Sequence, residues 1–547
     1  MTHTGPLGVV IQGSLTQGLE VRLHPDVSVE DLRVGKFLVV QGRRARFFCM
    51  LTDVVLGTAS PRILADPPAP HNQFLTQVLA GTGTYSTINL SPMLVLVTGD
   101  GDQPMELLPV KTVPSHFSQV YEASEQDFRS VFGWEDDPHR RNFAIGRPLD
   151  MDVPICLDLD RFVERSNGIF GKSGTGKSFL TRLLLCGIIH KQAAVNLVFD
   201  MHSEYGWEAM KEGKEASTVK GLKQLFPDQV QIYTLDPDST KRRGVPQAQE
   251  LRISLDQIEV EDLELLREVL NLSEASIENA NILRAEYGNQ WISQLLQLSN
   301  EEIQEFCQTR RGSPAAIMAL QRKLQRLENL SYICSASANN YVQQILRDLD
   351  AGKHVVIEFG SQSNLLAYML AANIITRRIH GSYVKKAEKF LQSKDPKDRP
   401  RQLVITIEEA HRFLNPAVAH QTIFGTIARE MRKYFVTLLV VDQRPSGIDN
   451  EVMSQIGTRI TALLNDERDI EAIFTGVAGS QGLRSVLAKL DSKQQALVLG
   501  HAVPMPVVMQ TRPYDQAFYQ SLGYLDSTQD REKILARAQA ARRDLGV

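Results

Sequence analysis

Residues 171–178 read Gly-Lys-Ser-Gly-Thr-Gly-Lys-Ser and satisfy the spacing G-x-x-x-x-G-K-[ST]. The apolar pair Ile169-Phe170 precedes this loop, and leucine and isoleucine recur after it at helical spacing. A strand, a glycine-rich loop and a helix in this order form the setting in which the motif binds phosphate groups. The segment therefore predicts a phosphate-binding loop in a parallel α/β sheet.

The residue types explain how this loop would hold ATP. Glycines let backbone N–H groups turn toward phosphate oxygens, and the following helix points its positive end at them. We expect Lys177 to reach the β- and γ-phosphates as a catalytic residue, and the Ser178 hydroxyl to bind Mg²⁺. A structural glycine-rich turn is the alternative interpretation. The residues expected to bind the nucleotide are Gly171, Lys172, Ser173, Gly174, Thr175, Gly176, Lys177 and Ser178.

A second candidate segment ends in two adjacent glutamates. Residues 403–407 predict a buried strand that delivers Glu408 and Glu409 at its C-terminal end. Ligands of parallel sheets bind at that end. We expect Glu408 to complete the Mg²⁺ site and Glu409 to polarise the attacking water. Alternatively, the pair marks a helix N-terminus, where the helix dipole favours carboxylates.

A polar residue follows the next predicted strand, residues 435–441. Gln443 would then lie at the same sheet edge as the phosphates. We predict that its amide senses the γ-phosphate. A polar loop residue without such a role is the alternative.

Three arginines are candidates for a contact between subunits. Arg165 lies six residues before Gly171. An extended segment would place it about 20 Å from the loop, too far to reach its own nucleotide. We expect Arg165 to reach a neighbouring subunit's nucleotide, where an arginine supplied in trans accelerates hydrolysis by about 10³–10⁵. Arg429 and Arg432 precede their predicted strand, so the same argument applies, with ion-paired surface arginines as the alternative.

The composition limits the function classes. The chain of 547 residues is 43% hydrophobic and 23% charged, which is typical of folded globular chains. Its net charge of −4 excludes attraction of nucleic acid by the whole surface, so a basic site must be local. No secretory signal is visible, and the apolar runs are shorter than the roughly 18 residues of a membrane span. We therefore expect a cytoplasmic protein without membrane contact.

Changes in pattern divide the chain into segments. Short β-rich runs begin it, strands alternating with helices follow, and a stretch with only helical periodicity interrupts them. The expected divisions are a small β-barrel at 1–115, a linker at 116–153, ATPase core at 154–254 and 351–526, a helical insertion at 255–350 and a helical tail at 527–547. The expected fold class is an α/β P-loop NTPase with a RecA-like parallel sheet, an N-terminal small β-barrel and a helical insertion.

The most basic stretch runs from Arg377 to Arg401. It carries nine Lys and Arg residues against three acidic ones. A charge run of this kind is typical of a solvated surface loop, which is the interpretation we favour.

Together these segments resemble the HerA family of hexameric DNA-translocating ATPases, within the wider group that includes FtsK and the conjugation ATPases. Arg165 stands where the family carries its trans-acting arginine, and residues 171–178 match its phosphate loop. Asp200-x-His202-x-Glu204-Tyr205 matches its D-x-H-x-E-Y signature, residues 407–413 its acidic motif and residues 443–446 its sensor. Ser166, Met431 and Phe435 depart from the family pattern.

The resemblance implies a function and its partners. It implies a homohexameric ring that translocates double-stranded DNA with ATP and Mg²⁺, and a NurA-like nuclease or other effector as partner in DNA end processing or repair. It also implies that the N-terminal segment is a HAS-type barrel. Alternatives are a ring ATPase that regulates or assembles an effector enzyme in defence or secretion, and a nucleotide switch. The switch would need [NT]-K-x-D, and residues 488–491 lack its first residue.

Overall fold

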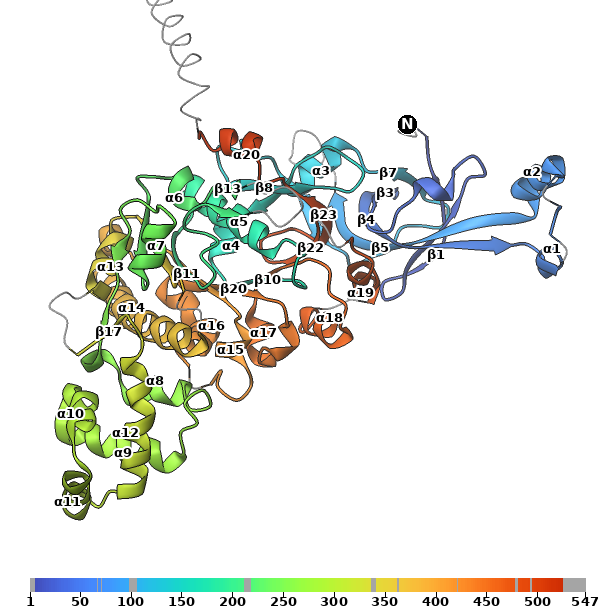
Figure 1. Ribbon diagram of the computed structural model, residues 1–547. Coiled ribbons are helices and arrows are strands. Elements are labelled where there is room, and N and C mark those ends of the chain that lie inside the picture. The colour runs from blue at the N-terminus through green and yellow to red at the C-terminus, as the bar shows by residue number, and fades with distance from the viewer. Residues whose placement is uncertain are drawn as a thin grey trace, which may run out of the picture.

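The computed structural model shows an elongated molecule, with a β-domain at one end, an α/β domain in the middle and a helical projection at the other end (Figure 1). The tail expected at 527–547 lies outside the described residues. The described residues are 5–65, 67–69, 71–97, 106–210, 218–335, 341–361, 364–420, 422–477, 481–491 and 494–524.

The N-terminal domain is a closed antiparallel barrel, as predicted. Six strands run in the order β2-β1-β7-β3-β4-β5, β2 pairs with β5 to close the barrel, and β6 flanks β5. Alternation along β3 sends Leu38 and Val40 into the barrel interior, while Phe37 and Val39 pack toward the α/β domain. The strands are β1 (Gly8–Ser14), β2 (Gly18–Leu23), β3 (Phe37–Gln41), β4 (Ala45–Thr58), β5 (Thr84–Val97), β6 (Glu106–Pro109) and β7 (Gln119–Glu122), with the short helix η1 (Val29–Asp31) between β2 and β3.

Strands β4 and β5 continue past the barrel as a long hairpin. Two short helices, α1 (Pro61–Ala65) and α2 (Gln73–Thr82), lie at its outer end (Figure 1). Large apolar side chains are exposed there: Leu56 is 75% and Phe74 is 78% accessible. The hairpin therefore presents an apolar tip to its surroundings.

The central domain is built on one twelve-stranded sheet, and its parallel part confirms the predicted α/β fold. The parallel strands run in the order β15-β14-β18-β11-β19-β20-β10-β21. Every residue of β11, β18, β19 and β20 is buried, because helices cover both faces. The strands are β10 (Asn167–Phe170), β11 (Val195–Asp200), β14 (Val230–Thr234), β15 (Gln249–Glu250), β18 (His354–Glu358), β19 (Leu403–Glu408), β20 (Val436–Asp442) and β21 (Thr458–Thr461).

Four antiparallel strands extend the sheet beyond β21. They are β22 (Gln495–Gly500), β23 (Val507–Thr511), β8 (Asn142–Arg147) and β9 (Ile155–Asp158). Strand β7 of the barrel and strand β8 both lie in the segment expected to be a linker, where helix α3 (Glu125–Phe132) also forms. Short strands of this kind carry little periodic signal, and they form because distant partners offer an open edge.

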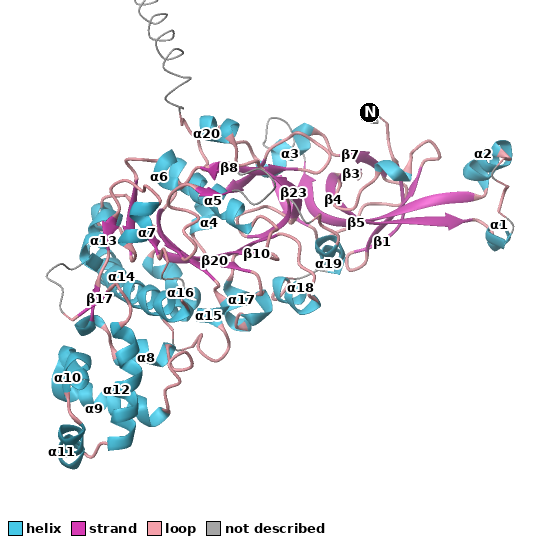
Figure 2. Cartoon of the chain, in the orientation of Figure 1, coloured by secondary structure: helices cyan, strands magenta, loops and turns pink. Residues whose placement is uncertain are grey.

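Helices cover both faces of the parallel sheet. Figure 2 shows α5 on one face and α14 and α16 on the other. Among the described helices, none has the length and apolar character needed to cross a bilayer. The helices of this domain are α4 (Leu159–Val163), α5 (Lys177–His190), α6 (Leu222–Leu225), α7 (Pro237–Arg242), α14 (Leu365–Ser393), α15 (His411–Leu414), α16 (Ile423–Glu430), α17 (Asn450–Gln455), α18 (Glu467–Ile473), α19 (Gln481–Ala488) and α20 (Gln516–Ser521), with η4 (Pro396–Asp398), η5 (Met431–Tyr434) and η6 (Pro445–Gly447).

The projection is a helical insertion, as predicted. Buried Trp291 anchors it, and its indole Nε1 donates to the Ile258 carbonyl at 3.1 Å. Its helices are η2 (Leu255–Gln257), α8 (Val260–Leu265), α9 (Glu274–Tyr287), η3 (Gly288–Gln290), α10 (Trp291–Gln297), α11 (Asn300–Arg310), α12 (Pro314–Glu328) and α13 (Tyr341–Asp350). One strand of two residues, β17 (Ile333–Cys334), interrupts the helices and pairs with β16 (Ile253–Ser254), and a further two-stranded sheet joins β12 (Ala209–Met210) to β13 (Thr218–Val219).

The basic stretch is not a surface loop, so that prediction was wrong. Most of it is the second half of the 29-residue helix α14. Arg377 Nη2 contacts the buried Asp262 carboxylate at 2.8 Å, and Asn373 donates to the same carboxylate at 2.7 Å. The charges therefore partly serve to join the helix to the insertion.

Candidate nucleotide-binding and hydrolysis site

The glycine-rich loop connects β10 to α5 and needs glycine at its bends. Gly174 and Gly176 have φ angles of 78° and 93°, in the left-handed region. A Cβ at Gly171 would lie 2.7 Å from Thr175 Oγ1 and 2.9 Å from the Ala462 side chain. The loop is therefore held in a compact turn at the N-terminus of α5, where backbone N–H groups are available to an anion.

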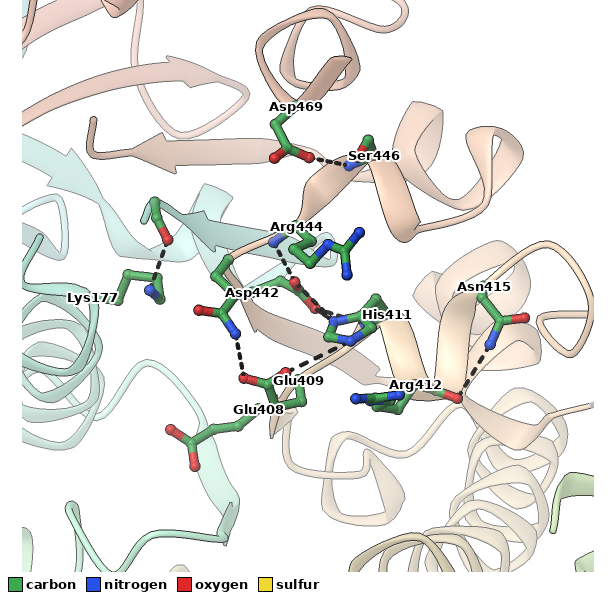
Figure 3. Close-up of polar contacts among 12 residues, drawn as sticks. Lys177, Glu408, Glu409, His411, Arg412, Asn415, Asp442, Arg444, Ser446 and Asp469 are labelled. Carbon is green, nitrogen blue, oxygen red and sulfur yellow. Dashed lines mark hydrogen bonds and ion pairs between the residues drawn. The ribbon is translucent and has the colours of Figure 1, made fainter. Parts of the chain in front are cut away.

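The loop lysine lies over this turn. Lys177 Nζ donates to the carbonyls of Gly171 at 2.7 Å and Lys172 at 3.0 Å, and Figure 3 shows the first of these contacts. Thr175 Oγ1 donates to the Lys172 carbonyl at 2.7 Å. Ser178 follows in the first turn of α5. The Lys177 ammonium group thus contacts the turn that would bind the phosphates, and Ser178 lies in the helix that directly follows it.

Glu408 lies at the end of β19 and is held on several sides. The Tyr205 hydroxyl donates to Glu408 Oε1 at 2.8 Å. The Tyr368 hydroxyl accepts from the Glu408 N–H and donates to its carbonyl, both at 3.0 Å. Tyr205 therefore holds one carboxylate oxygen of Glu408, and Tyr368 holds its backbone.

The environment of Glu408 suits a cation. Burial and the nearby Asp200 carboxylate raise the pKa of Glu408 to about 8. The charged form of the carboxyl is therefore disfavoured here, and a divalent ion would stabilise it. Glu408 Oε2 is buried and has no hydrogen-bond partner. Mg²⁺ prefers oxygen ligands, and both this carboxylate oxygen and the Ser178 hydroxyl are of that type.

Glu409 turns away from Glu408. Its φ of 49° is in the left-handed region, and its side chain is 30% exposed. Figure 3 shows the two carboxylates pointing in different directions. Gln443 Nε2 donates to Glu409 Oε1 at 3.4 Å. The Glu408 carboxylate is thus buried, and that of Glu409 is partly exposed.

The loop after β11 positions Tyr205 for its hydrogen bond to Glu408. The buried Asp200 carboxylate accepts the backbone N–H groups of Glu204, Tyr205 and Gly206 at 2.7, 2.8 and 3.1 Å. These bonds bend residues 200–206 back so that Tyr205 reaches Glu408. The D-x-H-x-E-Y motif could have indicated this contact, whereas no sequence signal indicated Tyr368, which lies 40 residues before Glu408.

Three carboxyl groups line the ends of adjacent strands. Asp200 is the register partner of Glu358, and β19 with Glu408 lies on the other side of β11. Burial and Asp200 raise the pKa of Glu358 to about 7, although Arg243 pairs with it. Burial also raises the pKa of Asp200. Concentrated acidic groups of this kind are typical of functional sites.

We expect removal of the Tyr205 hydroxyl to weaken the metal site. Replacing Tyr205 with phenylalanine removes the hydrogen bond to Glu408, and loss of such an outer contact lowers metal affinity by about 10- to 100-fold. The Mg²⁺ concentration for half-maximal ATPase activity should rise accordingly. Tyr233→Phe is the matched control, since that buried hydroxyl donates to Asp348 at 2.7 Å. An equal Mg²⁺ requirement in both variants would contradict the role of Tyr205.

The three candidate arginines lie away from the loop of their own chain. Arg165 is exposed, precedes β10 and packs beside Gly457, at the end of the strand opposite Gly171. Arg429 Nη1 donates to the Ala419 carbonyl at 3.2 Å, near the start of β20. Arg432 lies in η5, and its side chain is outside the described residues. The structure therefore does not bring these residues together with Lys177 and Glu409 within one chain.

Known proteins match this chain along most of its length. Residues 143–379 match the family described as Helicase HerA, central domain, and residues 7–102 match the HAS barrel domain. The DNA double-strand break repair helicase HerA of Pyrococcus furiosus is 24% identical over 439 residues, 74% of each chain. That of Sulfurisphaera tokodaii is 23% identical over 523 residues, 93% of each chain. VirB4 of Thermoanaerobacter pseudethanolicus is 14% identical, with a TM-score of 0.43 over 69% of this chain and 98% of its own.

The fold and the site define a P-loop ATPase of the α/β class. Its phosphate loop follows β10, its acidic pair begins at the last residue of β19, and β20 lies between these strands. The central domain matches the HerA helicase central domain, and the barrel matches the HAS barrel domain. In sequence and in domain order the chain is similar to the HerA helicases.

Proposed function

We propose that this chain is an ATP-driven motor that translocates double-stranded DNA in the manner of a helicase. The observation that carries the proposal is the strand order β19-β20-β10, which sets Glu409, Gln443 and Lys177 at the ends of three neighbouring strands. Relatives that cover 74% and 93% of the chain are named as DNA double-strand break repair helicases, which supports DNA as the substrate.

The site residues divide the work of hydrolysis. The loop N–H groups and Lys177 bind the phosphates, and Ser178 and Glu408 would hold Mg²⁺, which neutralises phosphate charge when bound. Glu409 accepts a proton from the attacking water, which can reach its carboxylate because the side chain is partly exposed. Gln443 reports the γ-phosphate to β20 through its contact with Glu409.

The active unit we propose is a homohexameric ring. Arg165 lies at the sheet end opposite its own phosphate loop, so it serves the nucleotide of an adjoining subunit. Arg429 and Arg432 lie at that same end and are further candidates for this contact. The interface is head-to-tail, which closes into a ring when the rotation allows.

We also propose a NurA-like nuclease as partner, in the processing or repair of DNA ends in the cytoplasm. The exposed apolar side chains at the tip of the β4–β5 hairpin support a protein partner, because large apolar groups on a solvated arm are typical of interaction surfaces. The second candidate function is a ring ATPase that regulates a different effector enzyme. The same exposed apolar side chains support it, because they would contact that enzyme instead.

Duplex DNA is expected to stimulate the ATPase. Contacts to the phosphate backbone release counterions, so the stimulation should be several-fold at about 50 mM salt and should fade toward about 200 mM. Steady-state ATPase assays with and without linear duplex DNA measure it. Lys177→Ala, assayed in parallel, controls for contaminating ATPases. Absence of both DNA binding and stimulation at low salt would refute a DNA motor.

A further inference from the structure

The loops after β19 and β20 are tied together by one buried carboxylate. Asp442 Oδ1 accepts the Arg444 N–H and Oδ2 accepts the His411 N–H, both at 2.7 Å. The Asp442 side chain is fully buried. A carboxylate that binds backbone groups of both loops fixes the distance between Glu409 and Gln443, which precede them.

His411 continues this connection to Glu409. Its Nδ1 lies 2.9 Å from Asp442 Oδ2, and since a carboxylate only accepts, Nδ1 carries the donated hydrogen. Its Nε2 lies 3.7 Å from Glu409 Oε2. Figure 3 shows the ring between the two carboxylates. The two oxygens of Glu409 therefore face different groups, Gln443 on Oε1 and His411 on Oε2.

The imidazole has little freedom to turn. Its side chain is only 13% exposed. A Cβ added to Gly447 of η6 would lie 3.2 Å from His411 Cβ, so this third segment closes on the histidine from another side. A ring that is enclosed and donates through Nδ1 sets the direction of the Glu409 carboxylate when Nε2 also carries a hydrogen, because the carboxylate offers no donor of its own and the 3.7 Å contact is then an ion pair.

We propose that His411 is a positioning residue that holds the Glu409 carboxylate in the direction needed to receive a proton from water, and that it transmits the position of β20 to Glu409. The proposal depends on the role proposed above for Glu409. Through Asp442, movement of the Gln443 loop displaces the histidine, and the histidine displaces the catalytic carboxylate. Turnover is thereby linked to the strand that carries the γ-phosphate sensor.

Two amide substitutions of His411 distinguish the roles of its two ring nitrogens. His411→Asn retains a donor near the position of Nδ1 for Asp442 but does not reach Glu409, and we expect it to lower kcat by about 10- to 100-fold, the cost of a misplaced catalytic group. The KM for ATP should stay nearly unchanged. His411→Gln carries its amide near the position of Nε2, so it should recover part of kcat. A purely structural role through Asp442 predicts the opposite order.

A second variant acts on the ring without removing a polar contact. Gly447→Ala presses against His411 and should lower kcat several-fold, with a smaller effect than H411N. In the Glu409→Gln background, H411N should cause no further loss, because a positioning residue has no effect once its target is gone. His116→Asn, on an exposed barrel loop, is the matched control. Thermal unfolding of each variant reports folding.

The outcomes separate the two proposals. If E409Q keeps wild-type turnover, the proposed function of the site fails. If E409Q is slow but H411N and G447A both turn over at the wild-type rate, the role of His411 alone is refuted. A rise in KM equal to the fall in kcat would also refute it, since that pattern indicates damage to nucleotide binding.

Discussion

Glu409→Gln is expected to slow ATP hydrolysis by about 10²–10⁴-fold while ATP still binds, the range that loss of a general base produces. The amide has nearly the same shape as the carboxylate and keeps its place beside Gln443, but it cannot take a proton from water. Glu408 and the phosphate loop are unchanged. Single-turnover hydrolysis and equilibrium binding of ATP measure the two effects separately.

The control for this variant is a glutamate remote from the site. Glu305 is exposed on α11 of the helical insertion, and Glu305→Gln should leave both hydrolysis and binding at wild-type values. Full turnover by E409Q would contradict the assignment, as would a loss of ATP binding equal to the loss of rate. The second result would indicate that Glu409 supports the nucleotide rather than the reaction.

Arg165→Ala should lower turnover by about 10³–10⁵-fold, the range for an arginine supplied in trans. The exposed guanidinium lies at the sheet end opposite its own phosphate loop, so its loss should leave the site of its own chain intact. ATP binding to the variant should therefore change little. Arg161→Ala is the matched control, since Arg161 is an exposed arginine on the neighbouring helix α4.

Mixing two inactive variants tests whether Arg165 acts across an interface. In rings assembled from R165A and K177A subunits, an R165A subunit supplies the intact phosphate loop and its K177A neighbour supplies the arginine. Random assembly makes about a quarter of the head-to-tail interfaces complete. Recovery of activity on mixing is expected. If mixtures stay as inactive as the separate variants, or if R165A alone keeps its rate, the interface assignment is wrong.

The parts of the fold that could be predicted are those with a strong local signal. Strands β11, β18, β19 and β20 are buried throughout and read as continuous apolar runs. The short strands β7, β8 and β9 were not predicted, because their pairing depends on edges formed by residues far along the chain. The basic stretch was misinterpreted because charge alone does not distinguish a solvated loop from a helix whose arginine pairs with buried Asp262.

For the site, the amino-acid sequence by itself determined the phosphate loop, the acidic pair and the polar residue after the next strand, because motif spacing and strand ends are local properties. Only the tertiary structure decided which side chains contact Glu408 and Glu409. Tyr205 and Tyr368 come to Glu408, and Asp442 and His411 to Glu409, from loops and helices that meet because the parallel strands bring their C-terminal ends to one edge. Contacts of this kind depend on packing between segments far apart in the chain, which no local pattern records.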